Sequence, residues 1–478
     1  MATTADTSPV PGAVPGPVTS PAADEGKLPV ALKLGWATGA FGIALLMNGI
    51  AGVLLLFAVS MLGIDPWLAG AIITVSKVFD AVTDPVVGMW SDRLRSPRGR
   101  RRPFLTWGAV LSAVSFAIIF TTPQFANQYL TAAYLFGALC LYAFGYTLFN
   151  IPYMSMPAEM TDSYHERSSI HAYRMVFVAL GGMAAGAGIK IALDALGSTE
   201  ARSWAIVGCV CAAAIFITLM TTYLSTASAR FTNAGEDSEK NKFEQLGEEF
   251  GAVVGNRHFL RLIGVKFSQL MGVQTMGAAM AYFFVQYLQQ DFTTLGLFFI
   301  VVSVSTIVCS PLLVMFSKTY GKKAAYYVAA AVNIAYALSW TFSGPDDPVW
   351  MILGRGLLVG VAFSGNVIMA MSMLTDIINE DAGRSGVRRE GAFTALYSFV
   401  EKVTGAFGPL IVGVALTYVG FDKSLPFDVP QGDNVNTALL LAVSWLPAIF
   451  YLIAVGLLTG YDLTEKDINS ATIEKEFS

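Results

Sequence analysis

The chain has 478 residues, of which 54% are hydrophobic and only 13% are charged, a balance too apolar for an ordinary soluble protein. Its formal net charge of -4 is small, and its basic residues gather in short loops, which argues against a nucleic-acid partner. The composition therefore predicts a protein embedded in the lipid bilayer.

Residues 1–30 are rich in proline, alanine, threonine and serine and hold few large apolar side chains. Such a segment cannot bury enough apolar surface to fold, so we expect a disordered tail. The chain then enters a long apolar run after Lys33, without the basic start and short apolar core of a cleaved signal peptide. We expect the first helix to remain uncut.

Runs of roughly 20 apolar residues predict an all-α membrane protein with twelve spans. The spans are expected at about 34–62, 67–91, 103–122, 130–158, 170–196, 203–226, 258–288, 292–316, 324–343, 348–376, 390–419 and 436–461. The polar stretch 227–257 divides them into six-helix halves, 31–226 and 258–461, followed by a C-terminal tail, 462–478. Basic loops of similar form after the second span of each half indicate two pseudosymmetric repeats.

The loops after the second, eighth and tenth spans carry most of the basic residues. Because positively charged loops stay in the cytoplasm, we expect both tails and the central loop to be cytoplasmic, in a multi-pass protein of the inner (plasma) membrane. Seven tryptophans near the expected span ends are predicted interfacial anchors: Trp36, Trp67, Trp90, Trp107, Trp204, Trp340 and Trp350.

The sequence contains no pattern typical of an enzyme. All four cysteines lie in apolar segments, and with only three histidines they form no metal-ligand cluster. We find no nucleophile paired with a base and no glycine loop that would cradle a phosphate. We therefore expect no cofactor, and no metal beyond an alkali cation.

The second span carries charges that hydrocarbon makes costly, in KVFDAVTDPVVG. Lys77, Asp80 and Asp84 are spaced three and four apart and so share a helical face. Two neighbouring carboxylates in low dielectric need a proton or metal ion between them, which predicts a site for sodium or a proton. Thr83 could add a hydroxyl, and Pro85 frees a backbone oxygen. The alternative is that Lys77 merely neutralises Asp80.

Polar groups in the fourth and fifth spans offer a surface for a hydroxylated ring. Tyr146 and Asn150 share a face of the fourth span, and Met154 continues it by one turn. Asn150 could instead cap a kink next to Pro152. Arg174 in the fifth span either faces the cavity or extends to the membrane interface, and its spacing does not decide between these.

The eleventh span carries Glu401 and Lys402 well inside the bilayer. A buried lysine is costly unless it is paired. Lys402 could pair across the two halves with Asp80 or Asp84, or pair locally, whereas Glu401 points to a different face.

Three stretches together resemble the glycoside-pentoside-hexuronide:cation symporters of the major facilitator superfamily: KVFDAVTDPVVGMWSDRLRSPRGRRRPF, NIPYMSMPAEMTDSYHERSSIHAYRM and GVRREGAFTALYSFVEKVTGAFG. The resemblance implies a major facilitator fold and a cation-binding site at Asp80, Thr83 and Asp84. It implies that Lys77 and Lys402 balance charge, and that the sugar pocket includes Tyr146, Asn150, Met154, Arg174 and Lys402.

The sequence departs from the galactoside-transporting members of that family at Ala44, Asn150 and Met154, where those members have two carboxylates and a tryptophan. Losing both carboxylates removes charge-assisted bonds to sugar hydroxyls, so we expect a different sugar, such as an anionic hexuronide, or a more apolar solute. The resemblance extends to lysolipid symporters, which keeps an amphiphilic substrate open.

We therefore predict a monomeric secondary transporter that couples sodium or a proton to a small carbohydrate substrate by alternating access. The loop after the second span, with Asp92, Arg93, Arg100, Arg101 and Arg102, is expected to form a cytoplasmic gate. A membrane sensor without transport would keep the fold but lose the ion site, which Asp80 and Asp84 argue against.

Overall fold

A computed structural model describes residues 28–94, 96, 101–161, 164–229, 251–385, 389–426 and 428–461. The expected N-terminal tail except for its last residues, most of the central loop, the C-terminal tail and Arg100 lie outside the described residues.

The first half of the chain is a series of helices joined by short loops in its described residues. Its elements are α1 (Val30–Ala51), α2 (Leu54–Leu56), η2 (Phe57–Met61), α3 (Pro66–Arg93), α4 (Arg102–Phe120), α5 (Gln128–Met160), α6 (Tyr164–Met183), η3 (Ala184–Gly188), α7 (Ile189–Leu196), α8 (Ala201–Ser225) and η4 (Thr226–Ser228).

The second half is helical in the same way. It comprises α10 (Arg257–Tyr282), η5 (Phe283–Tyr287), α11 (Phe292–Tyr320), α12 (Lys322–Ser339), η6 (Trp340–Phe342), α13 (Val349–Ser385), α14 (Glu390–Tyr418), α15 (Asp433–Val443) and α16 (Trp445–Thr459).

Each predicted span corresponds to one helix or a short series of helices. The first, fifth and seventh spans contain π-helical segments, η2, η3 and η5, that the apolar pattern does not reveal. The twelfth span breaks at Ser444 into α15 and α16, because Pro447 lacks an N–H and its ring would clash with the carbonyl of Val443. Helix α13 continues to Ser385, well past the expected end at residue 376.

Within the described part of the chain, nine spans are long and apolar enough to cross a membrane by length and composition alone. In the same residues, three further helices of span length, α3, α10 and α12, complete the set of twelve. These three are the more polar spans, and α3 and α10 bring charged side chains to mid-depth. Polarity in such helices is tolerated where they face protein or a water-filled cavity.

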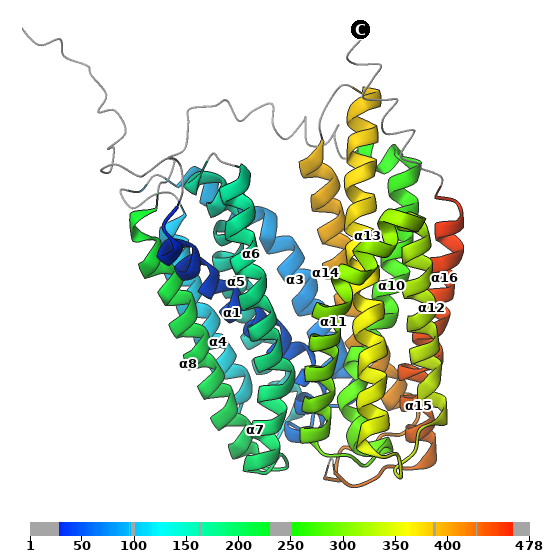
Figure 1. Ribbon diagram of the computed structural model, residues 1–478. Coiled ribbons are helices and arrows are strands. Elements are labelled where there is room, and N and C mark those ends of the chain that lie inside the picture. The colour runs from blue at the N-terminus through cyan, green and yellow to red at the C-terminus, as the bar shows by residue number, and fades with distance from the viewer. Residues whose placement is uncertain are drawn as a thin grey trace, which may run out of the picture.

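The two groups of helices, α1–α8 and α10–α16, draw together toward the end where α7 ends and α11 begins, and diverge toward the other end (Figure 1). We call these the closed end and the open end. Helix α1 begins and α16 finishes at the open end.

At the closed end, α3 and α14 pack against each other with little space between their backbones. A Cβ on Gly70 would lie 2.6 Å from the carbonyl oxygen of Pro409, so only glycine permits this approach. The Thr74 hydroxyl donates to the carbonyl of Ala406 across the same interface at 2.7 Å.

At the open end, the described ion pairs hold each half together separately. Lys33 pairs with Glu166 at 2.8 Å within the first half, and Lys322 pairs with Asp376 at 2.6 Å within the second. Among the described residues, the halves pack on each other chiefly through α3 with α14 and through α7 and η3 with α11.

The seven tryptophans expected to be anchors divide into two groups. Trp67, Trp90, Trp107 and Trp350 are exposed, as interfacial anchors would be. Trp36, Trp204 and Trp340 are at most 1% exposed, which corrects the expectation that they are anchors. Their rings pack on other aromatic rings inside each half, as when Trp36 stacks on Tyr153 with centroids 4.5 Å apart.

Candidate functional site

Asp80 and Asp84 of α3 meet one hydroxyl and one lysine at mid-depth. The Thr147 hydroxyl on α5 lies 3.1 Å from Oδ1 of Asp80 and 2.8 Å from Oδ1 of Asp84. Lys402 Nζ on α14 lies 3.0 Å from Oδ2 of Asp80 and also contacts Oδ2 of Asp84. The four-residue spacing on α3 turns both carboxylates to this single point.

Lys402 joins the two halves of the molecule electrostatically. Of the two pairings open to it from the sequence, the structure shows the one across the halves. Its ammonium also lies 5.6 Å from the ring centroid of Tyr146, within range of a cation–π interaction. A basic group therefore balances the two carboxylates, as buried charges require.

Lys77 does not form the local pair that the sequence left open. Its ammonium lies 6.0 Å from the ring centroid of Tyr142, whereas Lys402 occupies the position beside Asp80. Asp80 therefore pairs directly with Lys402 of the other half, whereas Lys77 acts on Asp80 only through a longer-range charge interaction.

Thr83, the third residue of the expected cation site, makes a local hydrogen bond. Its hydroxyl donates to the carbonyl of Asp80 at 3.0 Å, which is the local bond that helical threonines commonly make. Thr147 supplies a hydroxyl beside both carboxylates, and the role of Thr83 in the cation site stays a prediction. Thr147 lies three residues before Asn150 on α5, so the two share a helical face, and this spacing is a signal that the sequence offers.

The neighbour of Lys402 makes a different kind of pair. Glu401 Oε1 lies 3.0 Å from Nζ of Lys266 on α10, within the second half. The Lys266 ammonium also lies 5.2 Å from the ring centroid of Tyr397. Adjacent residues of α14 thus point to different helices, as the sequence predicts for Glu401.

The residues expected to contact substrate lie around this cluster on α5 and α6. Tyr146 is buried beside Lys402, Asn150 is half-buried, and Met154 is exposed. Arg174 is half-buried and close enough to Tyr146 to interact with it electrostatically. The structure therefore brings Tyr146, Lys402 and Arg174 to one region, and the role of each in binding substrate stays a prediction.

The described arginines of the expected gate contact the first half. Arg101 Nε pairs with Glu159 on α5 at 3.1 Å, and Arg102 donates to the carbonyl of Tyr223 on α8 at 2.9 Å. Arg100 and the side chains of Asp92 and Arg93 lie outside the described residues. The gate itself stays a prediction.

The ligand chemistry of the cluster suits a small hard cation. Carboxylate and hydroxyl oxygens from Asp80, Asp84 and Thr147 converge there, and such oxygens favour alkali cations or a proton. Among the residues that the structure describes, no group of three or more histidine, cysteine or acidic side chains forms a site for a transition metal.

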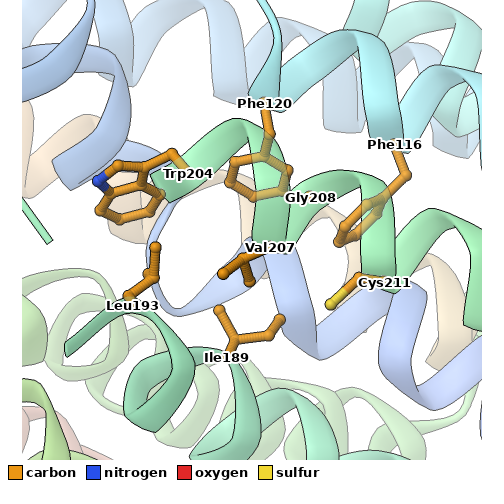
Figure 2. Close-up of a pocket in the computed structure, with 8 residues that line it drawn as sticks. All are labelled: Phe116, Phe120, Ile189, Leu193, Trp204, Val207, Gly208 and Cys211. Carbon is orange, nitrogen blue, oxygen red and sulfur yellow. The ribbon is translucent and has the colours of Figure 1, made fainter. Parts of the chain in front are cut away.

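A separate pocket within the first half is apolar (Figure 2). It is lined by Phe116, Phe120, Ile189, Leu193, Trp204, Val207, Gly208 and Cys211. The space between these side chains is too narrow to hold a water molecule. The Trp204 indole N–H donates to the carbonyl of Ser198. We interpret this pocket as packing between α4, α7 and α8.

Comparisons with known proteins identify the family of the chain. Residues 35–465 match the family model described as MFS/sugar transport protein. An uncharacterized symporter from Synechocystis sp. is 25% identical, with 92% of this chain and 95% of that protein covered. An isoprimeverose transporter from Lactiplantibacillus pentosus is 24% identical, with 92% and 91% covered.

Solved structures share the fold at low sequence identity. A bacterial homologue of the human drug peptide transporters PepT1 and PepT2 superposes with a TM-score of 0.65 at 13% identity, covering 94% of this chain and 99% of that one. The match of the family model over most of the length, together with the helices of the described residues, shows that this chain belongs to the MFS/sugar transport protein family: it is a multi-pass membrane transporter with the major facilitator fold, not an enzyme.

Proposed function

We propose that the protein couples sodium or a proton to the symport of a sugar or sugar derivative. The observation that carries this proposal is the cluster at mid-depth, where Asp80, Asp84 and Thr147 of one half meet Lys402 of the other. A charged contact between the halves has to change when they move relative to each other, so a cation bound there can control that movement.

Lys402 and the coupling cation compete for the same carboxylates. A sodium ion or proton at Asp80 and Asp84 supplies the positive charge that Lys402 otherwise provides, and so releases the lysine. The released ammonium then faces the substrate together with Tyr146. Cation and substrate consequently raise each other's affinity, as linkage requires.

The substrate is proposed to be carbohydrate rather than amphiphilic. A relative that covers most of this chain transports isoprimeverose according to its name, and the family model carries the description of sugar transport. Arg174 and Lys402 are basic groups near Tyr146, whereas Asn150 is uncharged, which favours an anionic sugar derivative over a galactoside.

We further propose that the protein acts as a monomer in the inner membrane with both termini cytoplasmic. A relative from Escherichia coli (strain K12), 22% identical over 89% of this chain, is described as an inner membrane symporter. Helix α1 begins and α16 finishes at the same end of the molecule, as this topology needs.

The test is a thermal-shift panel on purified protein. Neutral disaccharides, hexuronides and lysophospholipids are each added with sodium chloride or choline chloride, at pH 5.5 and pH 8. We expect a sugar or uronide to raise Tm, and the rise to be larger with sodium or at the lower pH. A cation-enhanced rise with lysophospholipids alone, or a sugar effect indifferent to both cations, would overturn the proposal.

A further inference from the structure

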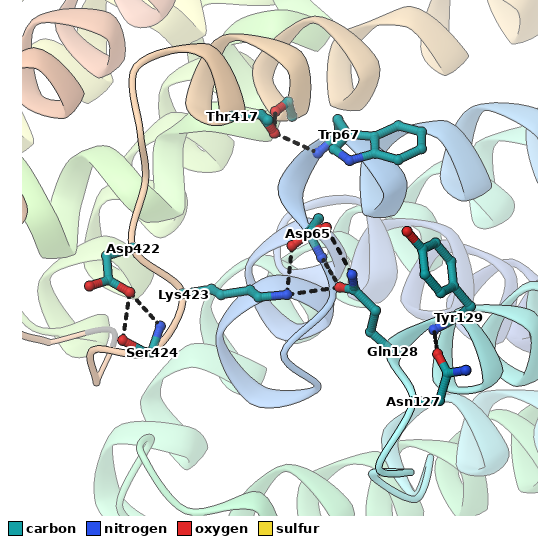
Figure 3. Close-up of polar contacts among 10 residues, drawn as sticks. Asp65, Trp67, Asn127, Gln128, Tyr129, Thr417, Asp422, Lys423 and Ser424 are labelled. Atoms are coloured by element: carbon teal, nitrogen blue, oxygen red, sulfur yellow. Dashed lines mark hydrogen bonds and ion pairs between the residues drawn. The ribbon is translucent and has the colours of Figure 1, made fainter.

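Polar residues at the closed end join the two halves around the start of α3 (Figure 3). Lys423, in the segment after α14, places its Nζ 2.6 Å from Oδ1 of Asp65 and donates to Oε1 of Gln128 at 2.8 Å. Gln128, the first residue of α5, donates to Oδ2 of Asp65 at 2.9 Å. One lysine of the second half thus holds two elements of the first.

Asp65 occupies the N-cap position of α3 but does not cap it. An aspartate there ordinarily accepts a hydrogen bond from an N–H of the first turn. The Asp65 side chain makes no such bond, and its carboxylate goes to Lys423 and Gln128 instead. The N–H of Trp67, which Asp65 leaves uncapped, donates to the Thr417 hydroxyl of α14 at 3.0 Å.

Two other helices of the protein offer a comparison. Asp291 is the N-cap of α11, the second span of the second half, and its Oδ1 accepts from the N–H of Thr294 at 2.7 Å. Asn127 likewise caps α5 by accepting from the N–H of Tyr129. Asp65 therefore lacks the capping hydrogen bond that comparable residues in this protein make. The two groups that would form it, the Asp65 carboxylate and the Trp67 N–H, bind Lys423 and Thr417 of the second half.

We propose that Asp65 is a partner-exchanging latch. With the closed end shut, its carboxylate binds Lys423 and the N–H of Trp67 binds Thr417. When the halves separate there, Lys423 and Thr417 withdraw together, and the Asp65 carboxylate turns to cap α3. The exchange keeps the Asp65 carboxylate and the Trp67 N–H hydrogen-bonded in either conformation, so it lowers the free energy needed to open the closed end. The ion pair with Lys423 meanwhile favours the closed conformation.

The Asp65 carboxylate of the latch is charged at neutral pH. The hydrogen bond from Lys423 lowers the pKa of the Asp65 carboxyl below its ordinary value of 3.8, with further lowering from Gln128 and from the lysine's charge, against the raising effect of burial. Because about a third of each side chain is exposed, water screens the pair. The latch therefore favours the conformation in which the closed end is shut, but it does not prevent that end from opening.

The experiment measures the opening of the closed end by pulsed EPR distances in nanodiscs. Spin labels are placed at Thr199 and Asp346, exposed positions in closed-end loops of the two halves, after the four native cysteines are replaced. We expect Lys423→Met to raise the ratio of long to short distances by about tenfold, since it removes a charged hydrogen bond but keeps the cap. The measurement needs neither substrate nor coupling ion, so it stands apart from the proposed function.

Substitutions of Asp65 separate partner exchange from a simple ion pair. Asparagine caps as well as aspartate, so Asp65→Asn weakens only the closed state, whereas Asp65→Ala loses the bond in both states. We expect a larger shift toward long distances with Asp65→Asn than with Asp65→Ala. Equal shifts, or the reverse order, would overturn the exchange.

Asp422→Asn is the matched control. It removes a charge next to Lys423, but its carboxylate accepts only from Ser424 within the same segment. The distances should stay those of the unmodified protein. A shift as large as that of Lys423→Met, or no shift with Lys423→Met, would contradict the latch.

Discussion

Two adjacent residues of α14 form ion pairs with opposite consequences. Glu401 pairs with Lys266 inside the second half, so this pair can persist when the halves move. Lys402 pairs with Asp80 and Asp84 of the first half, so its contacts must change in any such movement. Helix α14 therefore carries one ion pair that stabilises the second half and one that can couple the two halves. Only the second pair, at Lys402, can change when a cation binds Asp80 and Asp84.

The largest expected effect comes from removing one carboxylate of the cross-half pair. Asp84→Asn takes away a ligand charge, and we expect cation-driven uptake of the solute found in the thermal-shift panel to fall by about 100-fold. Uptake into proteoliposomes under an inward sodium or proton gradient measures this. Glu401→Gln, which alters a carboxylate of the within-half pair, should retain gradient-driven uptake. Equal losses of uptake in Asp84→Asn and Glu401→Gln would contradict a separate role for the ion pair between the halves.

A smaller effect is expected from the hydroxyl that the structure adds to the site. Thr147→Val loses the hydroxyl whose one proton is shared between the two carboxylates, which corresponds to about 1.5 kcal/mol and roughly a tenfold weaker cation affinity. Thr83→Val is the matched control, because its hydroxyl bonds a carbonyl of its own helix. Cation-dependent Tm shifts measure both. A loss with Thr83→Val and none with Thr147→Val would reverse the assignment.

The sequence predicts the helices better than their irregularities. Apolar runs of span length require helices in lipid, because every backbone group must be hydrogen-bonded internally. The π-helical segments η2, η3 and η5 depend on local packing that no apolar pattern records. Burial of Trp36 and Trp204 depends likewise on which ring lies opposite, so position near a span end did not distinguish them from the exposed Trp67.

The candidate site, too, depends on packing that the sequence pattern does not record. The four-residue spacing of Asp80 and Asp84 predicts a shared face, and charge balance predicts a lysine partner. Which lysine it is follows only from how the halves pack, and that packing selects Lys402 over Lys77. Thr147 was missed for the same reason, because its role depends on α5 lying against α3.

The most direct test of the account is the cation affinity of Lys402→Met beside that of Lys266→Met, measured by isothermal titration of sodium and by proton-dependent Tm. If Lys402 competes with the cation, removing its charge should tighten cation binding by about tenfold, because the carboxylates lose their internal partner. Lys266→Met removes a lysine from the within-half pair and should leave that affinity unchanged. Unchanged or weaker binding in Lys402→Met would contradict the account.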